Sequence, residues 1–147
     1  MLADTIKEKL NSNDLIYCGK ANEKALEADY IYVGFWTDKG RCDEVTENFL
    51  KTIHNKKVFL FGTCGFGASE EYFNTIAKRT ATFLSEDNEL VGSFICQGKM
   101  PMSVRQRYVK MKEAGTPIPN IDMLIDNFDK ALTHPDEKDL DNLSKKF

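Results

Sequence analysis

Three short apolar runs constrain the fold of this chain more than any other feature of its sequence. Each run is rich in β-branched or aromatic residues and is bounded by charged or turn residues. They cover residues 30–35 (YIYVGF), 58–62 (VFLFG) and 90–96 (LVGSFIC). Runs of this length and composition are typical of strands that are buried on both faces. They therefore predict a sheet with helices on both sides.

Helical patterns separate these runs. Val45, Phe49 and Ile53 repeat at intervals of four, and residues 72–84 carry a broad apolar face behind Ser69, which can cap a helix. An order of strand, helix, strand, helix, strand predicts parallel pairing through right-handed crossovers. The expected class is therefore a three-layer α/β fold.

Further elements are expected on either side of this central unit. Leu2, Ile6 and Leu10 form a helical stripe, and residues 14–18 (DLIYC) are a weaker strand candidate. Helices are expected over residues 102–114, 121–132 and 136–145, with Gly115 ending the first of these three. No repeat, low-complexity segment or linker interrupts the sequence, so residues 1–147 are expected to form a single domain.

Composition excludes several classes of function. The chain carries 20 Lys+Arg and 23 Asp+Glu, a formal net charge of −3, without the basic stripe that binds nucleic-acid phosphates. It has no apolar run long enough for a membrane span and no secretory signal, so we expect a cytoplasmic protein. The cysteines are widely spaced and form no C-x-x-C pair, so a metal site has little support.

The opening of the chain is unusual for a parallel α/β domain. Such domains normally begin with a strand whose turn into the first helix binds phosphate. Here the helical stripe starts at once, so we expect that strand and its loop to be absent. Strands left without this neighbour need another partner for their backbone groups. A rearranged sheet, an incomplete start and a strand supplied by a second chain all remain open, and the last would make a homodimer.

Four stretches of the sequence resemble the flavodoxin family, and together they run through nearly the whole chain. They are residues 29–40 (DYIYVGFWTDKG), 56–67 (KKVFLFGTCGFG), 92–100 (GSFICQGKM) and 127–140 (NFDKALTHPDEKDL). The resemblance implies a flavodoxin-like open parallel sheet that lacks its first strand. It also implies FMN as the cofactor and electron transfer to a partner reductase as the function. The family's T-G-N-T type loop, which wraps the FMN phosphate, is not present in this sequence.

The resemblance further implies which residues flank the flavin ring. The two loops concerned give as candidates Phe35, Trp36, Thr37, Asp38, Lys39 and Gly40, and then Thr63, Cys64, Gly65, Phe66 and Gly67. Trp36 would stack on the ring, the backbone after it would hydrogen-bond flavin N5, and amides of the second loop would bind the pyrimidine edge. Asp38 has an equally good alternative as the N-cap of the helix that follows.

Two other functions stay open beside electron transfer. A flavodoxin-like module could act by binding alone, because the phosphate loop normally supplies much of the affinity for FMN. A receiver-type signalling domain would use Asp38, Thr63 and Lys99, which follow the three strands, but its Mg²⁺-binding acidic pair belongs to the absent first strand.

A group of basic residues recurs along the helix expected over residues 102–114. The group consists of Arg105, Arg107, Lys110 and Lys112. It is either a solvated face or a surface that docks an acidic partner.

Overall fold

The computed structural model describes residues 1–10, 12–66, 69–115 and 120–147. These residues contain a sheet of four strands in the order β2-β1-β3-β4. The parallel strands are β1 (Tyr30–Asp38), β3 (Lys57–Cys64) and β4 (Glu89–Gln97). All three predicted strands are therefore confirmed. The sheet also has a two-residue strand, β2 (Arg41–Cys42), which pairs antiparallel with the end of β1 and was not predicted.

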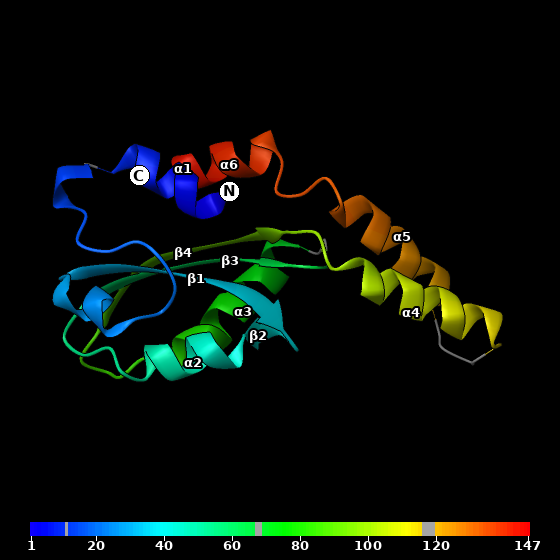
Figure 1. Ribbon diagram of the computed structural model, residues 1–147, viewed down its shortest axis with the longest axis horizontal. Coiled ribbons are helices and arrows are strands. Elements are labelled where there is room, and N and C mark those ends of the chain that lie inside the picture. Colours follow the sequence, from blue (N-terminus) through cyan, green and yellow to red (C-terminus); the bar gives the residue numbers. More distant parts are fainter. Residues whose placement is uncertain (11, 67–68, 116–119) are drawn as a thin grey trace.

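Helices cover both faces of the sheet (Figure 1). One face carries α1 (Leu2–Lys9) and α6 (Glu137–Ser144), and the other carries α2 (Glu44–Leu50) and α3 (Glu70–Ala81). Each interface has its own apolar core. The predicted three-layer α/β fold is confirmed.

The central strand β3 explains why the apolar runs are continuous. Val58 and Leu60 face the core shared with α2 and α3, whereas Phe59 and Phe61 face the core shared with α1 and α6. All four side chains are buried. A strand covered on both faces needs apolar residues at every position, because successive side chains point to opposite sides.

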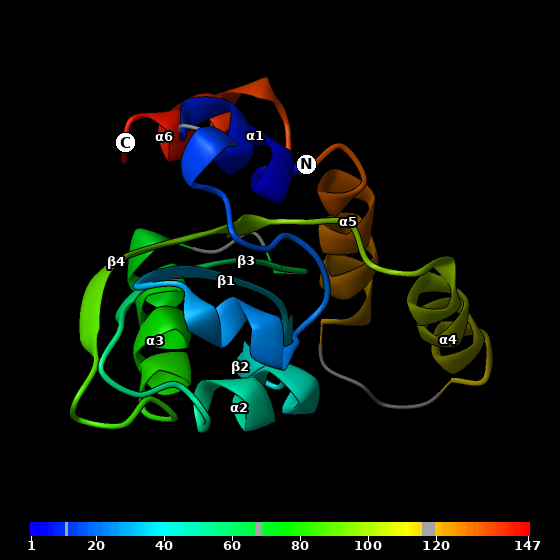
Figure 2. The same ribbon diagram turned by 60° about the vertical axis from the view of Figure 1, so that its left-hand side comes forward.

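The remaining helices, α4 (Met102–Glu113) and α5 (Ile121–Ala131), lie together beside the sheet (Figure 2). Arg105 Nε donates to Asp129 Oδ1 at 2.8 Å, and Lys112 pairs with Asp122, so ion pairs join the two helices. Helix α5 buries Phe128, whereas α4 buries none of its residues. None of the described helices is both long and apolar enough to cross a membrane.

The strand expected at residues 14–18 is wrong. A short 3₁₀ helix, η1 (Ser12–Asp14), is followed by chain without a helix or strand, in which Leu15 and Ile16 are exposed. A second 3₁₀ helix, η2 (Glu23–Glu27), leads into β1. Residues 14–18 pair with no strand of the described chain, and because this segment is mostly exposed, water can satisfy its backbone groups.

The pattern expected around α2 is also wrong in detail. Val45 is exposed, and Thr46 and Leu50 are the buried residues of this helix. The N-cap is Asp43, whose carboxylate accepts hydrogen bonds from the Thr46 N–H at 3.2 Å and the Thr46 hydroxyl at 2.8 Å. Asp38 does not cap α2, because the β1–β2 hairpin intervenes and the helix starts only after it.

The caps predicted elsewhere are confirmed. Ser69 Oγ accepts the Tyr72 N–H at the start of α3. Gly115 follows α4 with a φ of +67°, the left-handed conformation that ends many helices. These positions were recognisable because each depends on a local residue type and not on a distant neighbour.

Candidate functional site

The carboxyl ends of β1, β3 and β4 meet at one edge of the sheet, where open α/β folds bind their ligands. A groove of about 620 Å³ lies there. Its walls are the first turn of α1, the end segments of β1 and β3, residues 98–99 directly after β4, and residues 132–135. Chain segments that are far apart in sequence therefore build this groove together.

Trp36 is the most exposed large aromatic side chain at this edge, with 59% of its surface accessible. It pairs in register with Thr63 of β3. Because side chains alternate along a strand, Trp36 lies on the same face of the sheet as Tyr32 and Gly34, the face that carries α1 and α6. Trp36 does not line the groove, although Gly34 and Thr63 do. It stands next to these lining residues, nearer the carboxyl end of β1.

The first predicted flavin loop is a hairpin. Asp38 pairs with Arg41, and the turn between them consists of Lys39 and Gly40, with φ of +54° and +84°. Two residues with positive φ are the usual connection of a tight hairpin, and glycine adopts this conformation without strain. Thr37 therefore belongs to β1. Its Oγ1 is buried and has no hydrogen-bond partner among the described residues.

Two predicted site residues turn their side chains away from the groove. Phe35 and Cys64 are buried in the core against α2 and α3, so they offer backbone atoms to the edge. The Cys64 thiol donates to the Phe66 carbonyl at 3.2 Å. Burial raises the pKa of Cys64 to about 11, so the thiol stays neutral and unreactive near pH 7.

The second predicted loop follows β3, and distant side chains hold it. Gln97 Nε2 and Asn127 Nδ2 both donate to the Gly65 carbonyl, at 3.1 and 3.0 Å. The Gly98 N–H donates to the Cys64 carbonyl at 2.9 Å. Phe66 is 42% exposed at the same loop. The predicted site residue Gly67 lies outside the described residues.

Sequence reasoning therefore found part of this edge. Phe35 and Thr63 line the groove, and Trp36 and Phe66 are exposed beside it. The first turn of α1, residues 132–135 and Asn127 were missed as parts of the site. Asn127 and residues 132–135 lie in the stretch 127–140 that resembles the flavodoxin family, but nothing in that stretch indicates a role at this edge, to which the tertiary fold brings them. The predicted roles in flavin binding stay predictions.

A second cluster of polar side chains lies at the start of α6. His134 Nδ1 lies 2.6 Å from Asp139 Oδ2, and the potential ligand atoms of His134, Asp136 and Asp139 are within 4.8 Å of one another. Both carboxylates already belong to the capping box of α6. The hydrogen bond from the Asp139 N–H holds the pKa of Asp136 below its usual value. The cluster is thus explained as a helix cap.

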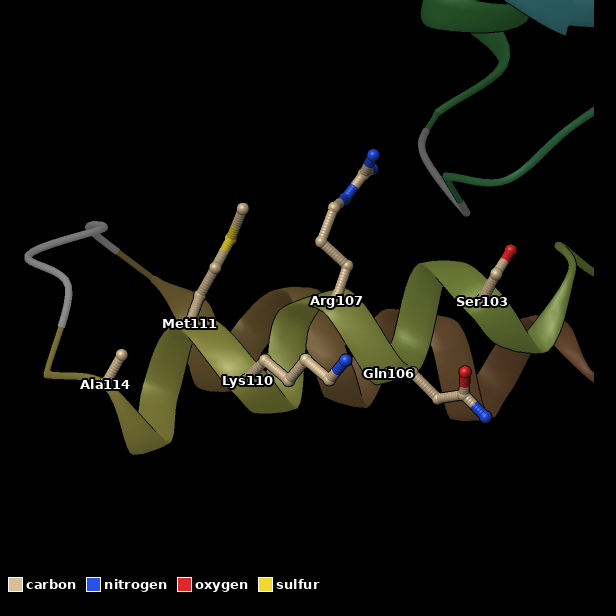
Figure 3. A pocket seen from close by; sticks show the side chains of 6 residues that line it. All are labelled: Ser103, Gln106, Arg107, Lys110, Met111 and Ala114. Atoms are coloured by element: carbon tan, nitrogen blue, oxygen red, sulfur yellow. The ribbon is translucent and has the colours of Figure 1, made fainter.

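A shallow hollow of about 390 Å³ lies on α4 (Figure 3). Arg107, Lys110 and Met111 are among the residues that line it, and Arg107 and Met111 extend toward the same side of the helix. The basic residues of α4 are therefore divided. Arg105 and Lys112 bind α5, whereas Arg107 and Lys110 stand at the hollow.

Comparison with known proteins agrees with this architecture. The sequence profile of the flavodoxin domain matches residues 1–147. The flavodoxin-like domain-containing protein BilS of Clostridium symbiosum (strain WAL-14163) is 39% identical over 127 residues, which are 83% of this chain and 67% of that protein. The protein of the same name from Clostridioides difficile (strain CD3) is 36% identical over 112 residues, which are 76% of this chain and 64% of that protein. The alignments thus span about two thirds of these relatives, and the chain belongs to the flavodoxin domain family.

Proposed function

We propose that this chain binds FMN at the carboxyl edge of its sheet and carries electrons to a partner protein. The observation that carries the proposal is Trp36, a large aromatic side chain that is 59% exposed at this edge. Together with Phe66, which is 42% exposed at the same edge, it gives this edge an aromatic surface that a ligand or partner could cover. Membership of the flavodoxin domain family supports a flavin as that ligand.

The residues at the edge fit the ring of a flavin. Trp36 and Phe66 offer exposed aromatic faces from neighbouring strand ends. Thr63, which pairs in register with Trp36 and lines the groove, offers a hydroxyl group. A planar, polar-edged ring needs this combination of stacking surface and polar groups.

The groove offers groups for the phosphate. Lys99 lines it with a cationic side chain, and the first turn of α1 has N–H groups without partners inside the helix. These groups would bind the anionic phosphate of FMN.

Electron transfer through a bound flavin requires no catalytic side chain from the protein. A bound flavin supplies the electron-accepting ring, and the chain binds it, orients it and excludes water from one face. The neutral, buried thiol of Cys64 would not compete with the flavin as a redox group. The exposed edge leaves room for a partner protein to approach the ring.

The first test is a titration of the purified chain with FMN. Trp36 is the only tryptophan, so its emission reports directly on this edge. We expect FMN to quench that emission and the protein to become yellow after removal of free flavin. A chain that stays colourless, with unchanged emission in excess FMN, would refute the proposal.

The role of Trp36 is tested with a matched pair of variants. We expect Trp36→Ala to weaken FMN binding on the order of tenfold, as the loss of one aromatic stacking contact implies. Tyr30→Ala is the control, because Tyr30 is an exposed aromatic residue at the opposite end of the same strand. Binding is followed by flavin fluorescence, which does not depend on the tryptophan. Equal affinity in both variants would remove Trp36 from the site.

A second candidate function is binding without flavin. The groove favours it, because Phe35 and Thr63 are the only predicted flavin residues that line the groove in the described chain. In that case the groove would hold a different small molecule or a peptide. A folded chain that ignores FMN would make this the leading candidate.

A further inference from the structure

Two side-chain amides converge on one backbone carbonyl beside the proposed flavin site. Gln97 Nε2 donates to the Gly65 oxygen at 3.1 Å and Asn127 Nδ2 donates to it at 3.0 Å. Gln97 Nε2 also lies 3.3 Å from Asn127 Oδ1, so the two amides are bonded to each other. These three groups, here called the Gly65 clamp, join the end of β4, the middle of α5 and the loop after β3.

We propose that Gln97 and Asn127 are positioning residues that hold Gly65 and Phe66, directly after β3, ready for a flavin ring. This inference rests on the proposed function. Helix α5 would then help to position the proposed flavin site through Asn127, which is 62 residues away from Gly65 in sequence.

Hydrogen bonds restrain three successive carbonyls, at residues 64–66. The Cys64, Gly65 and Phe66 carbonyls each accept a hydrogen bond, from the Gly98 N–H, the two amides and the Cys64 thiol respectively. The peptide between Gly65 and Phe66 is planar, so fixing its carbonyl also fixes the direction of the Phe66 N–H. The clamp therefore sets the orientation of the backbone donor that the loop would present to a ligand.

Loss of one hydrogen bond of the Gly65 clamp should destabilise the folded state. Gln97 is only 9% exposed, and a buried amide without hydrogen-bond partners destabilises the folded state. The Met100 side chain packs closely on Gly65, because a Cβ built at Gly65 would lie 2.4 Å from Met100 Sδ. The loop is thus packed against the segment after β4 as well as bonded to it. A loop fixed before binding loses less conformational entropy when a ligand arrives.

Asn88 provides a matched control. Its Nδ2 donates to the Ile53 carbonyl at 2.7 Å, and its Oδ1 accepts the Lys56 N–H at 3.0 Å. Asn88 thus joins two chain segments at the amino end of the sheet, since Ile53 and Asn88 precede β3 and β4, whereas Asn127 joins segments at the carboxyl end. Asn88→Asp should therefore cost stability without disturbing the proposed site.

The first measurement needs no flavin. In Asn127→Asp, a carboxylate replaces the amide donor and repels the Gly65 carbonyl. We expect hydrogen exchange of the amides of residues 64–66, and alkylation of Cys64, to become roughly tenfold faster, the change expected when a hydrogen bond that restrains the loop is lost. Both rates should stay near those of the parent chain in Asn88→Asp. Asn127→Ala, which removes the donor without adding charge, should give the same result if the aspartate variant fails to fold.

The second measurement is the affinity for FMN. We expect it to fall in Asn127→Asp and to be unchanged in Asn88→Asp. Unchanged exchange at residues 64–66 would show that the amides do not hold the loop, and the proposal would fail. Faster exchange with unchanged affinity would leave a purely structural contact and would equally overturn the positioning role. If the parent chain binds no FMN, both the proposed function and the positioning role toward flavin are wrong. The exchange rates still show whether the Gly65 clamp restrains residues 64–66.

Discussion

At the scale of single residues, burial divides the four thiols into two kinds. Cys18 is exposed, whereas Cys42, Cys64 and Cys96 are buried. Burial raises the pKa of Cys64 to about 11 and that of Cys96 to about 12, and it also raises the pKa of Cys42. Because the thiolate is the reactive form, these three thiols should react slowly with alkylating reagents, both because they are buried and because they stay protonated.

We therefore expect iodoacetamide at pH 8 to modify the folded chain at Cys18 alone. Peptide mass spectrometry after a short reaction would identify the site. In Cys18→Ser the folded protein should remain unmodified, and addition of denaturant should expose the other thiols. Rapid labelling of Cys64 in the parent chain would contradict the packing described for the loop after β3.

At the scale of elements, the cap of α2 gives a sharp comparison between two aspartates. Asp43 accepts two hydrogen bonds from Thr46 and is only 9% exposed, whereas Asp38 is exposed in β1. We expect Asp43→Ala to lower the free energy of unfolding by about 1–2 kcal/mol, the usual cost of losing an N-cap. Asp38→Ala should change it little. Urea unfolding of both variants measures these changes in the free energy of unfolding. A larger decrease for Asp38→Ala than for Asp43→Ala would show that Asp43 is not the cap of α2.

The two aspartates also show what the sequence could and could not predict about elements. Periodicity predicted β1, β3, β4 and the helices around them, because each of these elements carries its own apolar pattern. It did not predict β2, whose two residues are too few to show a period. This hairpin moves the helix start from Asp38 to Asp43. The strand prediction for residues 14–18 was wrong for another reason. A strand must pair with a neighbouring strand, and no local pattern shows whether it does.

Ion pairs connect α4 to α5, and of these two helices only α5 has buried residues. Helix α4 buries none of its residues, and Arg105 bonds to Asp129 of α5 through both Nε and Nη2, at 2.8 and 3.2 Å. We expect Arg105→Gln to speed amide hydrogen exchange throughout α4. Arg107→Gln is the control, because Arg107 forms no ion pair in the described chain. Equal exchange in the two variants would show that the ion pair does not hold α4.

The same ion pair has a defined pH dependence. The hydrogen bond from Arg105 holds the pKa of Asp129 below its usual value. A carboxyl whose pKa is lower in the folded state stabilises that state at pH values above its ordinary pKa, and this contribution is lost as the pH falls through the lowered value. An NMR titration of the Asp129 carboxyl carbon should show the lowered midpoint, and Arg105→Gln should return it to the ordinary range. A normal midpoint in the parent chain would mean that the pair does not persist in solution.

At the scale of the whole molecule, the groove shows why the site was only partly predictable. Motifs at strand ends located Thr63 and Trp36, because strand ends in a parallel sheet meet at a common edge. Residues 132–135 and Asn127 reach the edge through the path of α5 and the segment after it, and Lys99 lines the groove beside them. That path depends on how the helices pack on the sheet and on each other. A local pattern contains no information of this kind.

The two cores test whether the layers of the molecule are cooperative. Leu60 lies in the core with α2 and α3, Leu143 lies in the core with α1 and α6, and neither has accessible surface. The cores share one sheet, in which Phe59 and Leu60 are adjacent on β3 and face opposite sides. Disrupting either layer therefore removes support from a strand that the other layer also needs.

We expect Leu60→Ala and Leu143→Ala each to lower the free energy of unfolding by about 2–5 kcal/mol, the range for emptying a buried leucine site. Near- and far-ultraviolet circular dichroism should give one coincident transition in both variants, because the shared sheet couples the two cores. Met123→Ala, at a side chain that is 66% exposed, should leave the transition in place. If Leu143→Ala instead produced an early loss of helical signal followed by a separate transition of the sheet, α1 and α6 would form an independently unfolding layer. The wall of the groove that α1 provides would then open without unfolding of the sheet.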